Sequence, residues 1–174
     1  MKRIFIVLLL FQIIILSSCS QNNYLNYKDL NPKVTNLISD TYVNEIRYSG
    51  EAIEQIRVMA KEYGIMNPYI PTRGIGSDYV MEIREKEKSI MIVFPHFSLT
   101  QSLQNTIATE DIIEVRNIEL EIGNAKWIRI QNNPPVLYIK LKNVFISIST
   151  AKSFQEKDFE NIIESLVPLN NELN

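Results

Sequence analysis

Apolar and polar positions divide the chain into an N-terminal apolar run, two helical patterns, a series of strand patterns and a final helical pattern. Apolar residues recur at helical spacing over 32–46, which begins after an Asn-Pro pair, and over 50–63. Asn and Ser are common N-caps, Pro is favoured at the first helical position, and Gly is favoured after the last one. We therefore predict two N-terminal helices, the second capped by Ser49 and stopped by Gly64.

Strand patterns follow from residue 79 onward. Alternating apolar residues or short apolar runs predict strands at 79–84, 89–94, 112–122, 125–131, 136–141 and 144–150. Gly123-Asn124 and Lys142-Asn143 predict tight hairpin turns between neighbouring strands. We expect loops at 67–76, which is rich in Pro and Gly, and at 99–110, which is mostly polar.

The last helical pattern starts with Ser153 and Glu156 at the spacing of a capping box and ends at Pro168. Its apolar stripe must be buried, most simply across one face of the sheet, and consists of Phe159, Ile162, Ile163 and Leu166. Hairpins follow one another and no β-α-β crossover is visible. We predict an α+β fold, an antiparallel β-meander of about six strands with two N-terminal helices and a C-terminal helix packed on the sheet, as a single domain over 32–174.

The N-terminal run has the layout of a secretory signal. Lys2 and Arg3 precede an apolar stretch, 4–16, which only Gln12 interrupts and which small residues follow. As a helix this stretch rises about 20 Å, which is short of the hydrocarbon core of about 30 Å. A spanning helix is therefore the weaker interpretation, and we predict that 1–18 is a signal peptide.

Leu16-Ser17-Ser18-Cys19 resembles a bacterial lipobox. The resemblance implies that the Cys19 thiol receives a diacylglycerol, since a thiolate readily forms a thioether, and that the leader is cut just before Cys19. Two or more acyl chains, such as palmitate, hold a protein stably on a membrane. We expect a lipid-anchored protein on the extracytoplasmic face of the cell membrane, or at the outer membrane of a Gram-negative cell, with 19–31 as a polar tether.

Charge and cysteine content limit the cross-links, metal sites and partners that this protein can have. Cys19 is the only cysteine, so its lipidation excludes disulfides and Cys-ligated metals. The net charge of the chain is −2 at pH 7, and loss of Lys2 and Arg3 with the leader makes it −4. This mild acidity does not indicate a nucleic-acid partner.

The stretch from Ile118 to Thr150, IELEIGNAKWIRIQNNPPVLYIKLKNVFISIST, is similar to extracytoplasmic domains of unknown function in lipoproteins and anti-sigma-like membrane proteins of low-GC Gram-positive bacteria. The similarity covers roughly 78–167 and depends on core and turn residues, namely Ile122-Gly123, Trp127, Leu137, Ile146-Ser147 and Ser165-Leu166. Two positions depart from the family pattern, since Ile139 stands in place of Trp and Asn143 in place of Gly. The resemblance implies a fold and a cell-surface setting, and it transfers no catalytic residue.

His96 is the only histidine and could act as a general base near neutral pH. Base catalysis also needs a nucleophile and an orienting group, and no Gly-x-Ser-x-Gly motif surrounds the nearby Ser98 and Thr100. One His and no free Cys exclude most zinc sites, and the acidic residues lack the spacing of a calcium loop. We predict no catalytic residue, no metal and no cofactor.

The sequence favours a lipid-anchored, non-enzymatic cell-surface protein that binds an envelope partner or ligand, on the sheet face left free by the last helix or in the helix–sheet crevice. The alternative is a carrier or sensor of an apolar molecule in a cavity of about 300 Å³ or more beneath that helix. A hydrolase, the third class, needs His96 beside Ser, Asp or Glu in a cleft. Aromatic residues are candidates for the ligand or partner surface, although Trp127 also fits a core position: Phe94, Phe97, Trp127, Tyr138 and Phe145.

Overall fold

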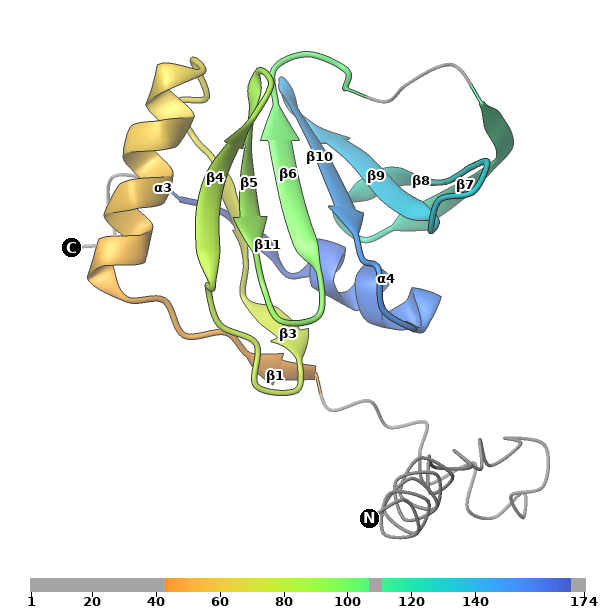
Figure 1. Ribbon diagram of the computed structural model, residues 1–174, viewed down its shortest axis with the longest axis horizontal. Helices are drawn as coiled ribbons and strands as arrows, with labels where there is room; N and C mark the ends of the chain where they lie inside the picture. Colours follow the sequence, from red (N-terminus) through yellow and green to blue (C-terminus); the bar gives the residue numbers. More distant parts are fainter. Residues whose placement is uncertain (1–42, 107–110, 170–174) are drawn as a thin grey trace, which may run out of the picture. The chain divides into compact units, whose positions relative to one another are not determined.

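The computed structural model describes residues 43–106 and 111–169, which lie within one compact unit, Thr41–Asn174 (Figure 1). The leader, Cys19, the tether and most of the first predicted helix lie outside the described residues. The described part is mostly β structure with two helices, α3 (Gly50–Glu62) and α4 (Glu156–Glu164), and it is broadly α+β.

Seven antiparallel strands form the main sheet, in the order β4-β5-β6-β10-β9-β8-β7. In chain order these are β4 (Glu82–Lys86), β5 (Ser89–Val93), β6 (Ser98–Ser102), β7 (Ile112–Leu120), β8 (Gly123–Ile130), β9 (Val136–Leu141) and β10 (Val144–Ser149). The chain therefore runs β4-β5-β6, crosses to the far edge at β7, and returns strand by strand until β10 pairs with β6.

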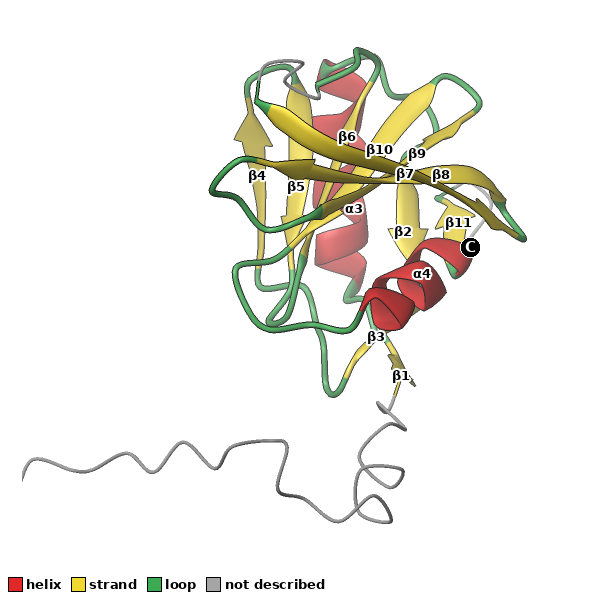
Figure 2. Ribbon diagram, turned by 90° about the vertical axis from the view of Figure 1, so that its right-hand side faces the viewer, coloured by secondary structure: helices red, strands yellow, loops and turns green. Residues whose placement is uncertain are grey.

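Two small strand pairs complete the fold. β1 (Val43–Glu45) pairs with β3 (Arg73–Ile75), and β2 (Tyr69–Pro71) pairs with β11 (Leu166–Pro168). Figures 1 and 2 show α4 and β11 on one side of the main sheet, while α3 runs along its β4 edge and contacts β4 and β5.

The two faces of the main sheet differ because side chains alternate along each strand. One face, here called the core face, packs against the helices and carries fully buried aliphatic residues: Ile90, Ile92, Leu99, Leu137, Ile139, Ile146 and Ile148. The opposite face, here called the open face, carries the alternate residues, among them Ser98 and Thr100 of β6 and Ser147 and Ser149 of β10.

The second predicted helix is confirmed. Ser49 accepts a hydrogen bond from the Ala52 amide through its hydroxyl, and Gly64 follows the helix with a φ of 75°. The first predicted helix is not confirmed. Val43–Glu45 form strand β1 instead, and directly after it the Ile46 amide donates to the Thr72 carbonyl at 2.9 Å. Pairing with β3 thus overrides the helical spacing of the apolar residues there.

The predicted loops at 67–76 and 99–110 were wrong where they contain β2, β3 and β6. Only 136–141 was predicted with the bounds of its strand. The turn at Lys142-Asn143 is confirmed, because Leu141 pairs with Val144 around it. The other hairpin turn lies at Glu121-Ile122 and not at Gly123-Asn124, because Leu120 pairs with Gly123, which is already part of β8.

The C-terminal helix is confirmed, but its predicted capping box is not. α4 begins at Glu156, after Gln155, whose side chain forms no capping hydrogen bond. The apolar stripe is buried as expected, although the helix ends at Glu164, so that Leu166 and Pro168 belong to β11.

A groove on the open face of the sheet

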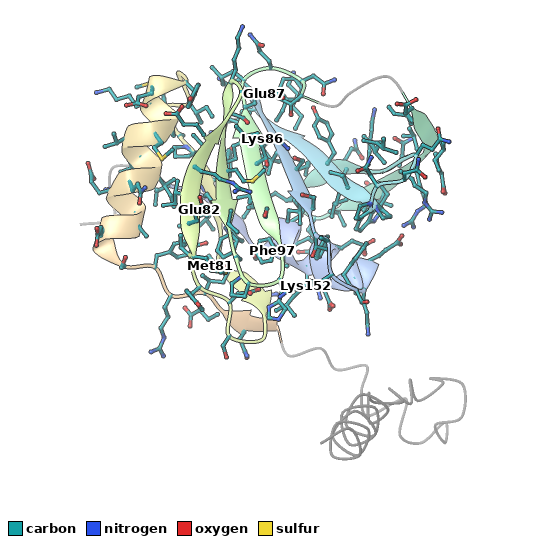
Figure 3. The ribbon with its side chains drawn as sticks, viewed as in Figure 1. Met81, Glu82, Lys86, Glu87, Phe97 and Lys152 are labelled. Atoms are coloured by element: carbon teal, nitrogen blue, oxygen red, sulfur yellow. The ribbon has the colours of Figure 1, made fainter. Side chains whose placement is uncertain are left out.

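Two adjoining hollows lie on the open face, with volumes of about 230 and 620 Å³. They share Ile130, Val136 and Ser149 as lining residues and are here called together the open-face groove. Lys86 and Glu87, at the β4–β5 turn labelled in Figure 3, line the first hollow, and Asp111 lines the second.

The floor of the groove is built by the two middle strands of the main sheet. Antiparallel pairing places Ser147 beside Thr100 and Ser149 beside Ser98. These four hydroxyls form no hydrogen bond with any other described residue. Thr100 is nevertheless only 9% exposed. None of the four hydroxyl oxygens is a buried atom without a partner, so they are accessible from the groove and offer donors and acceptors to a bound molecule.

Neighbouring hydroxyls on the same face are already satisfied. The Ser102 hydroxyl donates to the Lys88 carbonyl at 3.2 Å and accepts from the Gln104 amide at 3.0 Å. The Ser89 hydroxyl donates to the Lys86 carbonyl. The free hydroxyls are thus concentrated on the groove floor.

The wall of the groove is aliphatic. Ile128 and Ile130 of β8 and Val136 of β9 line the first hollow, and Pro134 lines the second. Ile128 pairs with Val136 across the strands and is 4% exposed. The groove therefore combines neutral hydroxyls on its floor with hydrocarbon on its wall, while its charged residues come from the β4–β5 turn and from the residue that precedes β7.

The five predicted aromatic residues lie on different faces of the sheet, and none of them is a lining residue of the groove. Phe94, Phe97 and Trp127 are buried in the core. Tyr138 and Phe145 stack on the open face with ring centroids 6.0 Å apart, and Lys140 lies over the Phe145 ring at 4.7 Å. The Tyr138 hydroxyl donates to Asn105 at 3.3 Å. The structure does not join the five into one surface.

Aromatic rings fill the region where α4 meets the sheet. The Phe159 ring of α4 lies 4.6 Å from Phe154, 6.1 Å from Trp127 and 6.4 Å from Phe97, measured between centroids. The Trp127 indole also donates to Glu160 at 3.3 Å. The apolar-carrier alternative requires a large cavity in this region, where these rings pack against one another.

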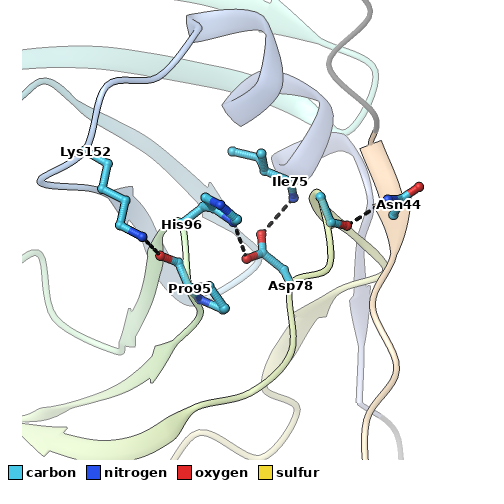
Figure 4. A network of polar contacts seen from close by, with 7 residues as sticks. Asn44, Ile75, Asp78, Pro95, His96 and Lys152 are labelled. Carbon is cyan, nitrogen blue, oxygen red and sulfur yellow. Dashed lines mark hydrogen bonds and ion pairs between the residues drawn. The ribbon is translucent and has the colours of Figure 1, made fainter.

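His96 lies beside a buried carboxylate (Figure 4). Its Nδ1 is 2.7 Å from Asp78 Oδ1, and Asp78 Oδ2 accepts from the Ile75 amide at 2.7 Å. The Asp78 side chain is fully buried, whereas the His96 side chain is 39% exposed. A carboxylate so placed holds the histidine with Nδ1 as the donor, as in a catalytic base with its orienting group.

This pair meets one condition of the hydrolase alternative, but no hydroxyl nucleophile is bonded to it in the described part of the chain. No Ser or Thr hydroxyl within 43–106 and 111–169 forms a hydrogen bond with His96. The contacts around the pair are structural, since Asn44 donates to the Gly76 carbonyl and Lys152 to the Pro95 carbonyl (Figure 4). The pair ties the loop before β4 to the turn between β5 and β6.

Sequence reasoning missed the groove floor. Its signal is an alternation of hydroxyl residues with core residues, Ser98-Leu99-Thr100 in β6 and Ser147-Ile148-Ser149 in β10.

The described residues contain no group of three or more His, Cys, Asp or Glu residues arranged to hold a metal ion.

Comparisons with protein-family models, with curated proteins and with solved structures give no match to this chain. No helix within the described ranges is long and apolar enough to cross a membrane.

Proposed function

We propose that this chain is a lipid-anchored, non-enzymatic extracytoplasmic protein that binds a neutral saccharide in the open-face groove. The observation that carries the proposal is Thr100, a mostly buried residue that lines the groove and whose accessible hydroxyl has no hydrogen-bond partner among the described residues. Ser98, Ser147 and Ser149 surround it with three further unpartnered hydroxyls.

The chemistry of the groove selects the ligand class. A purely apolar ligand would leave the floor hydroxyls without partners, at a cost of about 1–3 kcal/mol for each buried group. An anionic ligand would find only Lys86 among the lining residues of the first hollow, with Glu87 beside it. A sugar ring suits both surfaces, since its hydroxyls donate and accept while its C–H face packs against aliphatic side chains.

The cell-surface setting of this proposal comes from the sequence. The charged and apolar leader supports export from the cytosol, and the lipobox-like Leu16-Ser17-Ser18-Cys19 supports a lipid anchor at Cys19. A saccharide ligand agrees with this extracytoplasmic location, because glycans are major components of bacterial envelopes. Binding without catalysis is part of this proposal, and no Ser or Thr hydroxyl in the described part of the chain is hydrogen-bonded to His96.

Calorimetric titration tests the proposal with a panel of neutral tetrasaccharides, namely chitotetraose, cellotetraose, maltotetraose and mannotetraose. We expect at least one to bind with a dissociation constant below about 1 mM. Thr100→Val keeps the shape of the side chain and removes its hydroxyl, so it should weaken that binding about tenfold without lowering the free energy of unfolding.

Ser102→Ala is the matched control. Its hydroxyl lies on the same strand and face but is already bonded to the Lys88 carbonyl. This variant should bind the saccharide normally and be slightly less stable. Binding of none of the four sugars, or equal binding by wild type and Thr100→Val, would refute the proposal.

A further inference from the structure

We propose that two copies of this chain associate edge to edge through β7, as antiparallel strands centred on Val115. The main sheet has two edges, β4 and β7. Each edge strand has one neighbour, so alternate residues along it direct backbone N–H and C=O groups away from the sheet. This inference depends on the geometry of the edge and is independent of the groove and its ligand.

The two edges are protected very differently. β4 has five residues, of which only Ile83 is uncharged, and α3 contacts it. Short, charged and covered edges resist pairing with other strands. β7 has nine residues, with a bulge between Ile112 and Glu114 and regular pairing from Glu114 to Leu120, and it exposes Ile113 (61%) and Val115 (50%). A long edge with exposed aliphatic residues is the kind that pairs with another strand.

The sequence of β7 is complementary to itself in one register. When Val115 lies opposite Val115 of a second copy, Glu114 lies opposite Arg116, and the two-fold axis repeats this ion pair. Directly opposed side chains of antiparallel strands point to the same face and interact, and opposite charges there are favourable.

Neighbouring registers are disfavoured by like charges. Centring the pair on Arg116 places two arginines opposite each other, and centring it on Glu114 does the same with two glutamates. Centring it on Asn117 places Val115 opposite Glu119 and gives no ion pair. Charge complementarity therefore selects the Val115 register and a second copy of the chain as the occupant.

Each of the two charged residues already has a partner within its own chain, Arg116 with Glu156 of α4 and Glu114 with Arg129 at 3.5 Å. The Glu114 and Arg116 side chains are still 54% and 46% exposed, so each can accept a second partner.

Val115 also pairs with Ile128 of the groove wall. A continuous sheet through β7 would therefore present both grooves on the same face.

Charge reversal combined with molar mass measurement tests the pairing. The full chain, purified in detergent and analysed by sedimentation velocity, should be a dimer at about 100 μM. Glu114→Arg and Arg116→Glu should each place like charges opposite each other and raise the dissociation constant at least tenfold. An equimolar mixture of the two variants should dimerise again, since each arginine then faces a glutamate.

The mixture also separates loss of pairing from loss of folding, because two misfolded variants would not restore the dimer. A monomeric wild type at 100 μM would overturn the proposal. So would a mixture that stays monomeric while each variant retains the circular dichroism spectrum of the wild type, or single variants that dimerise as tightly as the wild type.

Discussion

At the scale of single residues, the Gln101 side chain forms the two backbone hydrogen bonds that a neighbouring strand would otherwise form with Tyr69. Its side chain is fully buried; it donates to the Tyr69 carbonyl at 2.8 Å and accepts from the Tyr69 amide at 2.7 Å. One amide thus satisfies both backbone groups of a buried residue in β2. This explains how a polar residue occupies the core face of β6.

Replacing that amide should be costly. Gln101→Met keeps the length of the side chain but leaves the Tyr69 N–H and C=O without partners, so we expect the free energy of unfolding in urea to fall by about 2–4 kcal/mol. Gln104→Met, at an exposed position of the same segment, should change it by less than about 0.5 kcal/mol. Similar values for the two variants would show that the Tyr69 contact is not important for stability.

Buried tyrosines make the stability of the fold sensitive to high pH. Burial raises the pKa of Tyr48 far above its ordinary value of 10, and the nearby Asp78 carboxylate raises that pKa further. Burial also raises the pKa of Tyr138 to about 12. A raised pKa means that the folded state keeps its proton where the unfolded state has lost it. The stabilisation is therefore complete below pH 10 and is lost as the pH rises through the folded-state values.

We expect the urea midpoint of the wild type to fall between pH 10 and pH 12, and to fall less steeply in Tyr48→Phe. At pH 8 this variant should lose about 1 kcal/mol, because the Tyr48 hydroxyl donates to the Pro71 carbonyl at 2.8 Å. Tyr138→Phe, with the smaller shift, should have an intermediate slope. A slope unchanged in Tyr48→Phe would be inconsistent with this explanation.

At the scale of elements, the residues that follow β1 and β3 pack against β3 closely enough to require glycine at position 74. A Cβ atom at Gly74 would lie 2.8 Å from Asp78 Cβ and 2.9 Å from Ile46 Cγ1. Gly74→Ala should therefore lower the free energy of unfolding by about 1–3 kcal/mol. Gly50→Ala is its control, since no atom lies within 4 Å of the added Cβ at the start of α3. Thermal unfolding of both variants measures the difference, and equal midpoints would argue against close packing at Gly74.

Elements with a strong apolar pattern were predictable from the sequence. α3 has a recognisable cap and stop, β5 is an apolar run, and α4 has a stripe of residues that the structure buries. The spacing of apolar residues was enough to predict these three elements, because each of them buries its own apolar side chains.

Elements stabilised by distant partners were not predictable. β6 reads Ser-Leu-Thr-Gln-Ser and resembles a polar loop, because neither the Tyr69 backbone that bonds Gln101 nor the hollow beside Thr100 can be seen in the local sequence. The same is true of β1, whose partner β3 lies some thirty residues away. The residues of the candidate site were missed for this reason, since its floor lies on β6 and on the strand beside it, although the sheet face left free by the last helix was an expected binding surface.

At the scale of the whole molecule, the proposed lipid anchor can be tested independently of the proposed groove. Cys19→Ala should prevent lipidation, so the unprocessed or soluble chain should replace the mature membrane-bound form in cell fractions. Ser18→Ala keeps a small residue before the cysteine and should be processed normally. Unchanged processing and membrane retention in Cys19→Ala would count against the lipid anchor.

The central claim is that the open face of the sheet binds a neutral saccharide, and mapping by nuclear magnetic resonance tests it most directly. Backbone amide shifts of the purified chain would be followed during titration with each of the four tetrasaccharides. We predict that the largest changes occur in β6, β8 and β10, around Thr100, Ile128 and Ser147. Largest changes on α3 or α4, or no change at 10 mM sugar, roughly ten times the expected upper limit of the dissociation constant, would contradict the claim.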